Sequence, residues 1–134
     1  MKRFIYEYPG ILSLTWAGII LFLCATPGRY IPSVSWLELL SFDKWVHAGI
    51  FFVLSVLLLI FSHKSGYGRS VTGLFVILSI AYGVLMELMQ AMYFSERSAD
   101  WLDVAANSFG SVLALFFMGK IRRLVRDHRG ISTT

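Results

Sequence analysis

Residues 71–94 read VTGLFVILSIAYGVLMELMQAMYF, and this stretch decides the fold. A run of about 24 apolar residues is long enough to cross the hydrocarbon core of a bilayer as an α-helix. Within that core the backbone must satisfy its own hydrogen bonds, so helices are favoured over open strands. The run therefore predicts a transmembrane helix, and this helix carries one carboxylate, that of Glu87.

Three further apolar runs of similar length lie on either side of it, at residues 11–27, 45–62 and 101–119. The chain has 134 residues, of which 57% are hydrophobic and only 15% are charged, and this composition excludes a water-soluble globule. We therefore predict an all-α integral membrane protein. Residues 1–134 form a single domain, a bundle of four transmembrane helices.

The basic residues divide the connections between the runs into two groups. Arg29, Lys44 and Arg97 lie between the first and second runs or between the third and fourth. The other nine of the 12 Lys and Arg residues precede the first run, join the second to the third, or follow the fourth. By the positive-inside rule, we predict that both termini are cytoplasmic.

A signal peptide is the alternative interpretation of the first run. However, Leu23 stands before Cys24, where lipoprotein processing needs a small residue, and Pro27 follows closely. Cys24 is the only cysteine, which excludes an internal disulfide. The basic stretch 120–129 is typical of a segment that contacts anionic lipid, and we predict no nucleic-acid partner.

Polar residues occur where lipid is expected, near the outer ends of the helices. Glu87 lies about 10 Å below the outer end of its run, and an ionisable group in a span marks a functional site by default. Spacings of three and four residues place Glu87 with Gln90, and Asp103 with Asn107, on shared helix faces. Gly110 is expected to let a neighbouring helix approach closely. The complete polar set is Asp43, Lys44, His47, Glu87, Gln90, Arg97, Asp100, Asp103 and Asn107.

This set predicts a polar pocket that opens on the extracytoplasmic side and is roofed by residues 28–41. Glu87, Asp103 and His47 are the candidate catalytic residues, because carboxylates and imidazole can handle a proton there. Asp43 precedes His47 by one helical turn and can orient its imidazole, with capping of the helix as the alternative role. The candidate ligand-binding residues are Asp43, Lys44, Gln90, Arg97, Asp100 and Asn107, with Lys44 and Arg97 as anion contacts.

Metal and nucleophile chemistry are constrained by the other residues of the chain. His63 and His128 lie on the cytoplasmic side, so a histidine-rich zinc site is excluded. An oxygen-ligated divalent cation at the acidic residues is an alternative, but we predict no metal and no cofactor. Ser111 needs His47 to reach it across the bundle before it can act as a nucleophile. The sequence contains neither a GxSxG nor an HExxH motif.

Four short sequences carry a resemblance to a known family: Ala-Thr-Pro at 25–27, DKWVH at 43–47, GVLMELMQ at 83–90 and RSADWLDVAANSFG at 97–110. With these, the chain resembles the VanZ-like family of small bacterial membrane proteins over nearly its whole length. The resemblance implies a four-helix protein of the bacterial cytoplasmic membrane. It also implies a link to teicoplanin, a glycopeptide with a lipid tail, because the family's namesake is associated with low-level resistance to it.

We therefore expect a cell-envelope protein that binds or modifies an amphiphilic ligand at the outer leaflet, such as a lipid-linked envelope precursor or a lipoglycopeptide. Whether it is an enzyme stays open. The alternative is a structural or partner-binding protein whose polar residues hold the helices together. A transporter is disfavoured, because we find no inverted repeat and expect no polar residues across the inner halves of runs 45–62 and 101–119. Contacts with membrane lipids and a homo-oligomer are compatible with both hypotheses.

Overall fold

The structure, a computed structural model, describes the backbone of residues 2–27, 42–94 and 100–131. Over these residues the protein is helical and contains no strand, so the predicted all-α fold is confirmed for this part of the chain. The helices are α1 (Lys2–Glu7), α2 (Pro9–Ala25), α4 (Phe42–Lys64), α5 (Arg69–Met92), α6 (Trp101–Phe116) and α7 (Met118–Ile131).

Local sequence explains where these helices begin and where the chain turns. α2 begins at Pro9, whose fixed φ suits the first helical turn and whose missing N–H is not needed there. α6 begins after Asp100, whose Oδ1 accepts a hydrogen bond from the backbone N–H of Leu102 at 2.8 Å. Between α4 and α5 the chain reverses at Gly66, whose φ of 77° is unfavourable for a residue with a Cβ.

Two helices, α4 and α5, are each long and apolar enough to cross a membrane. α6 and α7 supply a third candidate if the pair is one span, although the two helices are bent by 56° relative to each other. α2 is apolar but has only 17 residues. The described part of the chain thus offers two or three candidate spans. The predicted span at 101–119 covers all of α6 and the start of α7, because α6 ends at Phe116 and α7 begins at Met118.

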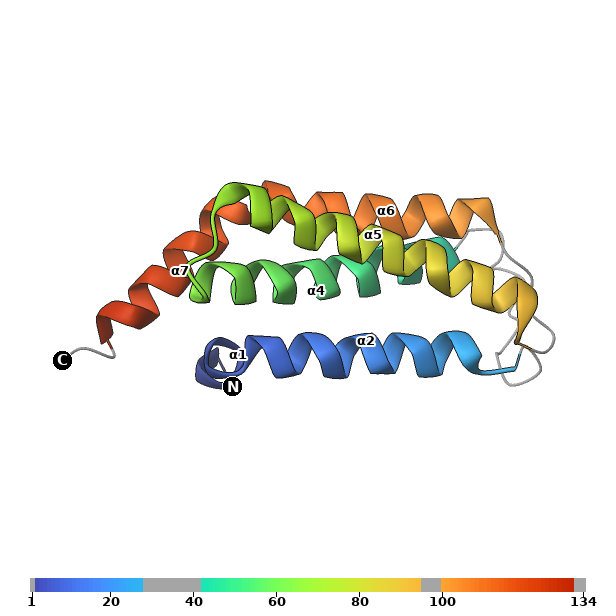
Figure 1. Ribbon diagram of the computed structural model, residues 1–134, viewed down its shortest axis with the longest axis horizontal. Coiled ribbons are helices and arrows are strands. Elements are labelled where there is room, and N and C mark those ends of the chain that lie inside the picture. The colour runs from blue at the N-terminus through green and yellow to red at the C-terminus, as the bar shows by residue number, and fades with distance from the viewer. Residues whose placement is uncertain (1, 28–41, 95–99, 132–134) are drawn as a thin grey trace.

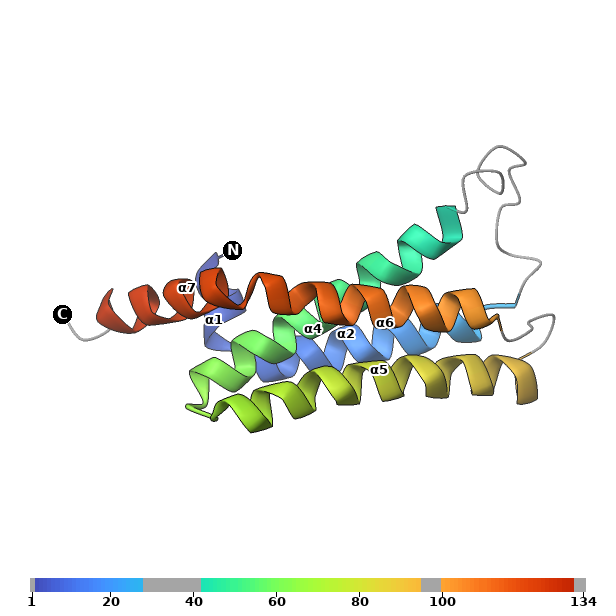
Figure 2. The same cartoon turned by 90° about the horizontal axis from the view of Figure 1, so that it is seen from above.

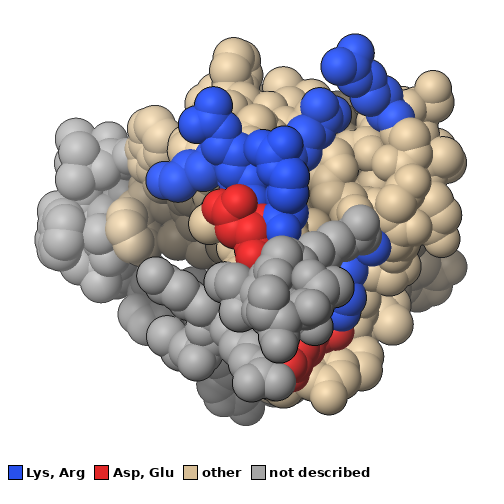
Figure 3. All heavy atoms as spheres, turned by 90° about the vertical axis from the view of Figure 1, so that its left-hand side faces the viewer, with Lys and Arg blue, Asp and Glu red and all other residues tan. Residues whose placement is uncertain are grey.

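α4 lies at the centre of the bundle and contacts α2, α5, α6 and α7. It crosses the other long helices obliquely, and α7 leaves the bundle at one end (Figures 1 and 2). Both termini lie at that end, where the rings of Tyr6 in α1 and His128 in α7 are 4.2 Å apart (Figure 1). Basic side chains gather on the same end (Figure 3), which we call the basic end; they include Lys64, Arg69, Lys120, Arg122, Arg123 and Arg126.

The backbones of α4 and α6 approach each other closely at Gly110. A Cβ built on this residue would lie only 2.0 Å from the backbone oxygen of Ala48, so no side chain fits there. The prediction that Gly110 permits close helix packing is confirmed. Since His47 precedes Ala48, and Asn107 precedes Gly110 by about one turn, the same contact brings these two polar side chains together.

The outer surface of the bundle is apolar. Leu14, Phe22 and Phe116 are 77%, 73% and 82% exposed, and they are accompanied by many other large hydrophobic side chains on every long helix. An exposed apolar surface of this extent marks contact with another apolar phase, here the membrane. The interior by contrast buries polar side chains, namely Ser13, Ser55, Ser62, Thr72, Ser79, Glu87, Gln90, Asn107 and Ser111.

Hydroxyl groups form two hydrogen-bonded layers inside the bundle. In the first, Ser79 Oγ lies 3.0 Å from the Oγ atoms of both Ser55 and Ser111, which links α4, α5 and α6. In the second, Ser62 Oγ and Thr72 Oγ1 are 2.8 Å apart. The expectation that the inner halves of the second and fourth runs hold no polar residues is therefore wrong. These hydroxyls bond to one another, so they connect helices without exposing polar atoms to lipid.

Candidate functional site

Most of the predicted site residues meet at the end of the bundle opposite the basic end. α4 contributes three of them in its first two turns, α5 contributes one near its last turns, and α6 contributes the others together with its N-cap. We call this group the polar cluster; it consists of Asp43, Lys44, His47, Glu87, Asp100, Asp103 and Asn107.

Lys44 joins the start of α4 to the start of α6. Its Nζ donates to Asp100 Oδ2 at 2.5 Å and to Asp103 Oδ1 at 2.6 Å, and it lies 2.9 Å from Asp43 Oδ2. The hydrogen bond from Lys44, with a second from the N–H of Leu102, holds the pKa of the Asp100 carboxyl below its usual range. Because three carboxylates already surround the ammonium group, it is not free to bind an anionic ligand.

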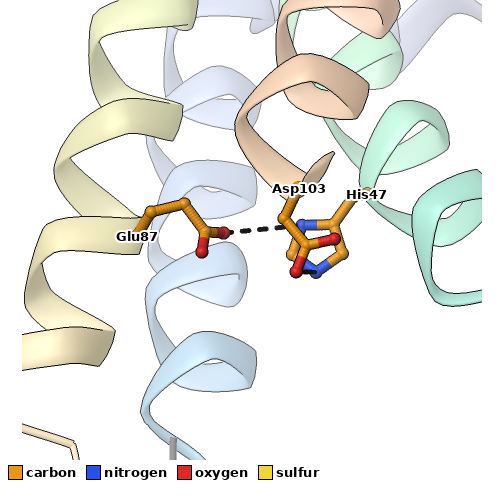
Figure 4. Close-up of side chains that lie close together, drawn as sticks. All are labelled: His47, Glu87 and Asp103. Atoms are coloured by element: carbon orange, nitrogen blue, oxygen red, sulfur yellow. Dashed lines mark ion pairs between the residues drawn. The ribbon is translucent and has the colours of Figure 1, made fainter. Parts of the chain in front are cut away.

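The imidazole of His47 lies between two carboxylates that come from two other helices (Figure 4). Its Nδ1 is 3.1 Å from Asn107 Oδ1 and 4.0 Å from Glu87 Oε1, and its Nε2 is 3.7 Å from Asp103 Oδ2. The amide oxygen of Asn107 can only accept a hydrogen bond, so in the neutral ring Nδ1 carries the proton. Nε2 then presents its lone pair on the side that faces Asp103.

Glu87 is almost completely buried, with 2% of its surface exposed. Its Oε2 accepts a hydrogen bond from the backbone N–H of Asp100 at 3.2 Å. Its Oε1 has no hydrogen-bond partner among the described residues, and Figure 4 shows the carboxylate pointing toward His47. A buried carboxyl group with an oxygen that lacks a hydrogen bond is costly to ionise, so it is expected to hold a proton or to have a positive charge beside it.

Some of the predicted site residues have other partners. The carboxylate of Asp43 pairs with Lys44, and Asn107 rather than Asp43 orients the imidazole. Gln90 donates to the backbone oxygen of Cys24 at 3.4 Å, which ties α5 to α2. Ser111 bonds to Ser79 instead of approaching His47. Arg97 and the loop 28–41 lie outside the described residues.

The hydroxyl layers are the feature that the sequence-based reasoning missed. A periodic signal was present: Thr72, Ser79 and Glu87 are seven and eight residues apart, and Ser55 and Ser62 are seven apart. Such spacings place residues on one face of a helix. This face points into the bundle, so the polar cluster and the hydroxyl layers share one interior seam of α4, α5 and α6.

The polar cluster is acidic. It contains four carboxyl groups, those of Asp43, Glu87, Asp100 and Asp103. The only positive charges that can balance them within the cluster are those of Lys44 and, when it is protonated, His47. An imidazole held between two carboxylates can exchange a proton with a group bound beside it. The arrangement is therefore able to handle a proton or to bind a cation at the end of an apolar bundle.

No protein-family model, curated protein or solved structure matches the chain. The polar cluster is thus interpreted from the geometry of its own residues.

Proposed function

We propose that this protein is a VanZ-like protein of the bacterial cell envelope that uses the polar cluster to bind an amphiphilic ligand at the outer leaflet of the cytoplasmic membrane. The observation that carries the proposal is the position of His47, 3.7 Å from a carboxylate of α6 and 4.0 Å from a buried carboxylate of α5. Ionisable side chains gathered from three helices at the end of an apolar bundle are typical of a functional site.

In this proposal each residue of the cluster has a distinct task. His47 exchanges a proton with the polar head of the ligand, and Glu87 and Asp103 flank the imidazole. Asn107 fixes the orientation of the ring, and Lys44 fixes Asp103. Arg97, with a guanidinium suited to phosphate or carboxylate, is the proposed anion contact.

The proposal includes a topology. α2, α4, α5 and α6 are the four membrane crossings, and the basic end with both termini faces the cytoplasm. The concentration of Lys and Arg at that end supports this orientation by the positive-inside rule. The polar cluster then lies at the extracytoplasmic surface, where the head of an amphiphile meets the lipid.

The proposed ligand class is a lipid-linked envelope precursor or a lipoglycopeptide of the teicoplanin type. Two points support it: the cluster lies at one end of an apolar surface that an acyl chain can contact, and the chain resembles the VanZ-like family.

The test is drug susceptibility in a sensitive bacterium that expresses the protein at matched membrane levels. We expect the wild type to protect against teicoplanin but not against vancomycin, which lacks the lipid tail. Glu87→Gln and Asp103→Asn should abolish protection although both variants still insert. Glu7→Gln and Asp127→Asn make the same chemical changes at the basic end and should protect like the wild type. Full protection by both cluster variants would rule out the assigned roles.

A second candidate function is purely structural, and the hydroxyl layers favour it, because they show that this bundle already uses buried polar groups to join helices. Interhelical hydrogen bonds of this kind contribute about 0.6 to 2 kcal/mol each. If the polar cluster is only such a connection, Glu87→Gln and Asp103→Asn lower the melting temperature, and protection falls only in proportion to the amount of protein in the membrane.

A further inference from the structure

The side chains of His47, Glu87 and Asp103 share a pattern that the proposed ligand function does not require. In each of them one polar atom is held by a neighbour, and a second polar atom has no hydrogen bond to a described side chain. Asn107 Oδ1 holds His47 Nδ1, the N–H of Asp100 holds Glu87 Oε2, and Lys44 holds Asp103 Oδ1.

The remaining carboxylate oxygens both approach the imidazole ring. His47 Nε2 lies 3.7 Å from Asp103 Oδ2, and Glu87 Oε1, which has no hydrogen bond to a described residue, lies 4.0 Å from Nδ1 of the same ring. Each residue can offer one ligand atom such that all three atoms lie within 4.8 Å of one another. Bonds of about 2.0 to 2.2 Å in a tetrahedral site place ligand atoms about 3.3 to 3.6 Å apart, so the most widely spaced of these side chains must move together by up to about 1.5 Å when an ion binds.

We propose that His47, Glu87 and Asp103 bind a divalent transition-metal ion, with Zn²⁺ as the best fit. Metal-bound histidines usually donate their second ring N–H to an oxygen, and metal-bound carboxylates are usually hydrogen-bonded as well. Asn107, Lys44 and the backbone of Asp100 occupy these supporting positions. The burial of Glu87 with one unsatisfied oxygen is the independent sign that a cation belongs at this place.

The donor set decides between classes of metal. Mg²⁺ and Ca²⁺ prefer oxygen ligands alone, whereas one imidazole nitrogen with two carboxylate oxygens suits Zn²⁺ and its first-row neighbours. Three protein ligands also leave a coordination position for water or for an oxygen of a ligand. The inference concerns the same three side chains as the proposed function, and with the ion bound His47 serves as a ligand instead of exchanging a proton. It stands apart from the drug phenotype, since zinc binding can be measured on the protein alone.

The experiment uses the full-length protein, purified in detergent with a tag that contains no histidine and stripped of metal with a chelator. Zn²⁺ binding is measured by competition with a chromophoric chelator. We expect the wild type to bind one Zn²⁺ per chain, and His47→Gln, Glu87→Gln and Asp103→Asn each to weaken binding at least about tenfold. The matched controls His128→Gln, Glu7→Gln and Asp127→Asn, all at the basic end, should bind like the wild type.

A measurement on the wild type alone keeps the test independent of how the variants fold. X-ray absorption spectroscopy of the zinc-loaded protein should show nitrogen and oxygen ligands with a single imidazole. Sulfur in the coordination shell, which would come from Cys24 or a methionine, or two or more imidazoles, would overturn the proposal. So would a triple variant, confirmed as helical and monodisperse, that binds Zn²⁺ as tightly as the wild type.

Discussion

At the scale of single residues, the polar cluster depends on one ammonium group. Lys44 contacts Asp43, Asp100 and Asp103, and each of these carboxylates would repel the others without it. Removal of one partner from a fully buried ion pair costs about 3 to 5 kcal/mol, whereas exposed pairs contribute about 0 to 1 kcal/mol. The side chain of Lys44 is 20% exposed, which places it between these limits.

We therefore expect Lys44→Met to lower the free energy of unfolding by about 2 kcal/mol, an intermediate value between those limits. The measurement is thermal unfolding in detergent, followed by the loss of helical circular dichroism. Lys120→Met, an exposed lysine of α7, is the matched control and should leave the melting temperature unchanged. Adding Asp103→Asn to Lys44→Met should restore part of the loss, because it removes one of the unbalanced charges. Identical melting of Lys44→Met and the wild type would show that the ammonium group does not stabilise the cluster.

At the scale of elements, the contact between α4 and α6 positions the site. Gly110 allows the backbones to touch at Ala48, and the neighbouring His47 and Asn107 then lie within hydrogen-bonding distance. Gly110→Ala would place a methyl group 2.0 Å from the backbone oxygen of Ala48, so the helices must separate.

Overpacking of this kind costs about 1 to 3 kcal/mol, and we expect Gly110→Ala to destabilise the protein by that amount and to separate His47 from Asn107. Gly73→Ala is the control, because nothing lies within 4 Å of a Cβ built there. Alanine is the better helix former, so this control should be neutral or slightly stabilising. Both variants are compared by thermal unfolding in detergent, and equal melting temperatures would contradict the assignment of Gly110 as a packing position.

Helices and their polar faces were predictable from the sequence, but contacts between helices were not. The spacing of Asp43 and His47 lies within one helix and is visible in the chain, whereas the true orienting partner, Asn107, is 60 residues away and depends on how α6 packs. The bend after Phe116 was missed for a similar reason. The next residues, Phe117 and Met118, are apolar, so hydropathy continues across the break.

At the scale of the whole molecule, charge is divided between two ends. The basic end carries the described Lys and Arg residues of α5 and α7, and the opposite end carries the acidic polar cluster. This division of charge predicts the orientation of the protein in the membrane, and cysteine labelling can test it. The native background is simple, because Cys24 is the only cysteine and is 4% exposed.

In a Cys24→Ala background, we expect Tyr93→Cys to react with a membrane-impermeant maleimide in intact cells. Asp127→Cys at the basic end should react only after the membrane is permeabilised. Tyr93 is 72% exposed beyond the end of α5, so access within the protein does not limit its reaction. The background without cysteine serves as the blank, and the reverse pattern of labelling would place the polar cluster in the cytoplasm.

The apolar exterior also changes what a mutational scan of this protein means. In a water-soluble protein, Leu14→Ser on an outward-facing position is close to neutral. Here the same substitution places a hydroxyl group in the hydrocarbon of the membrane. Its free-energy cost is that of transferring the hydroxyl from water to lipid. In the interior, Ser79→Leu destabilises the protein for a different reason: the buried site has no space for the larger side chain. In a mutational scan, positions that do not tolerate polar residues therefore mark the lipid-facing surface of this molecule. Positions that do not tolerate larger side chains mark its interior.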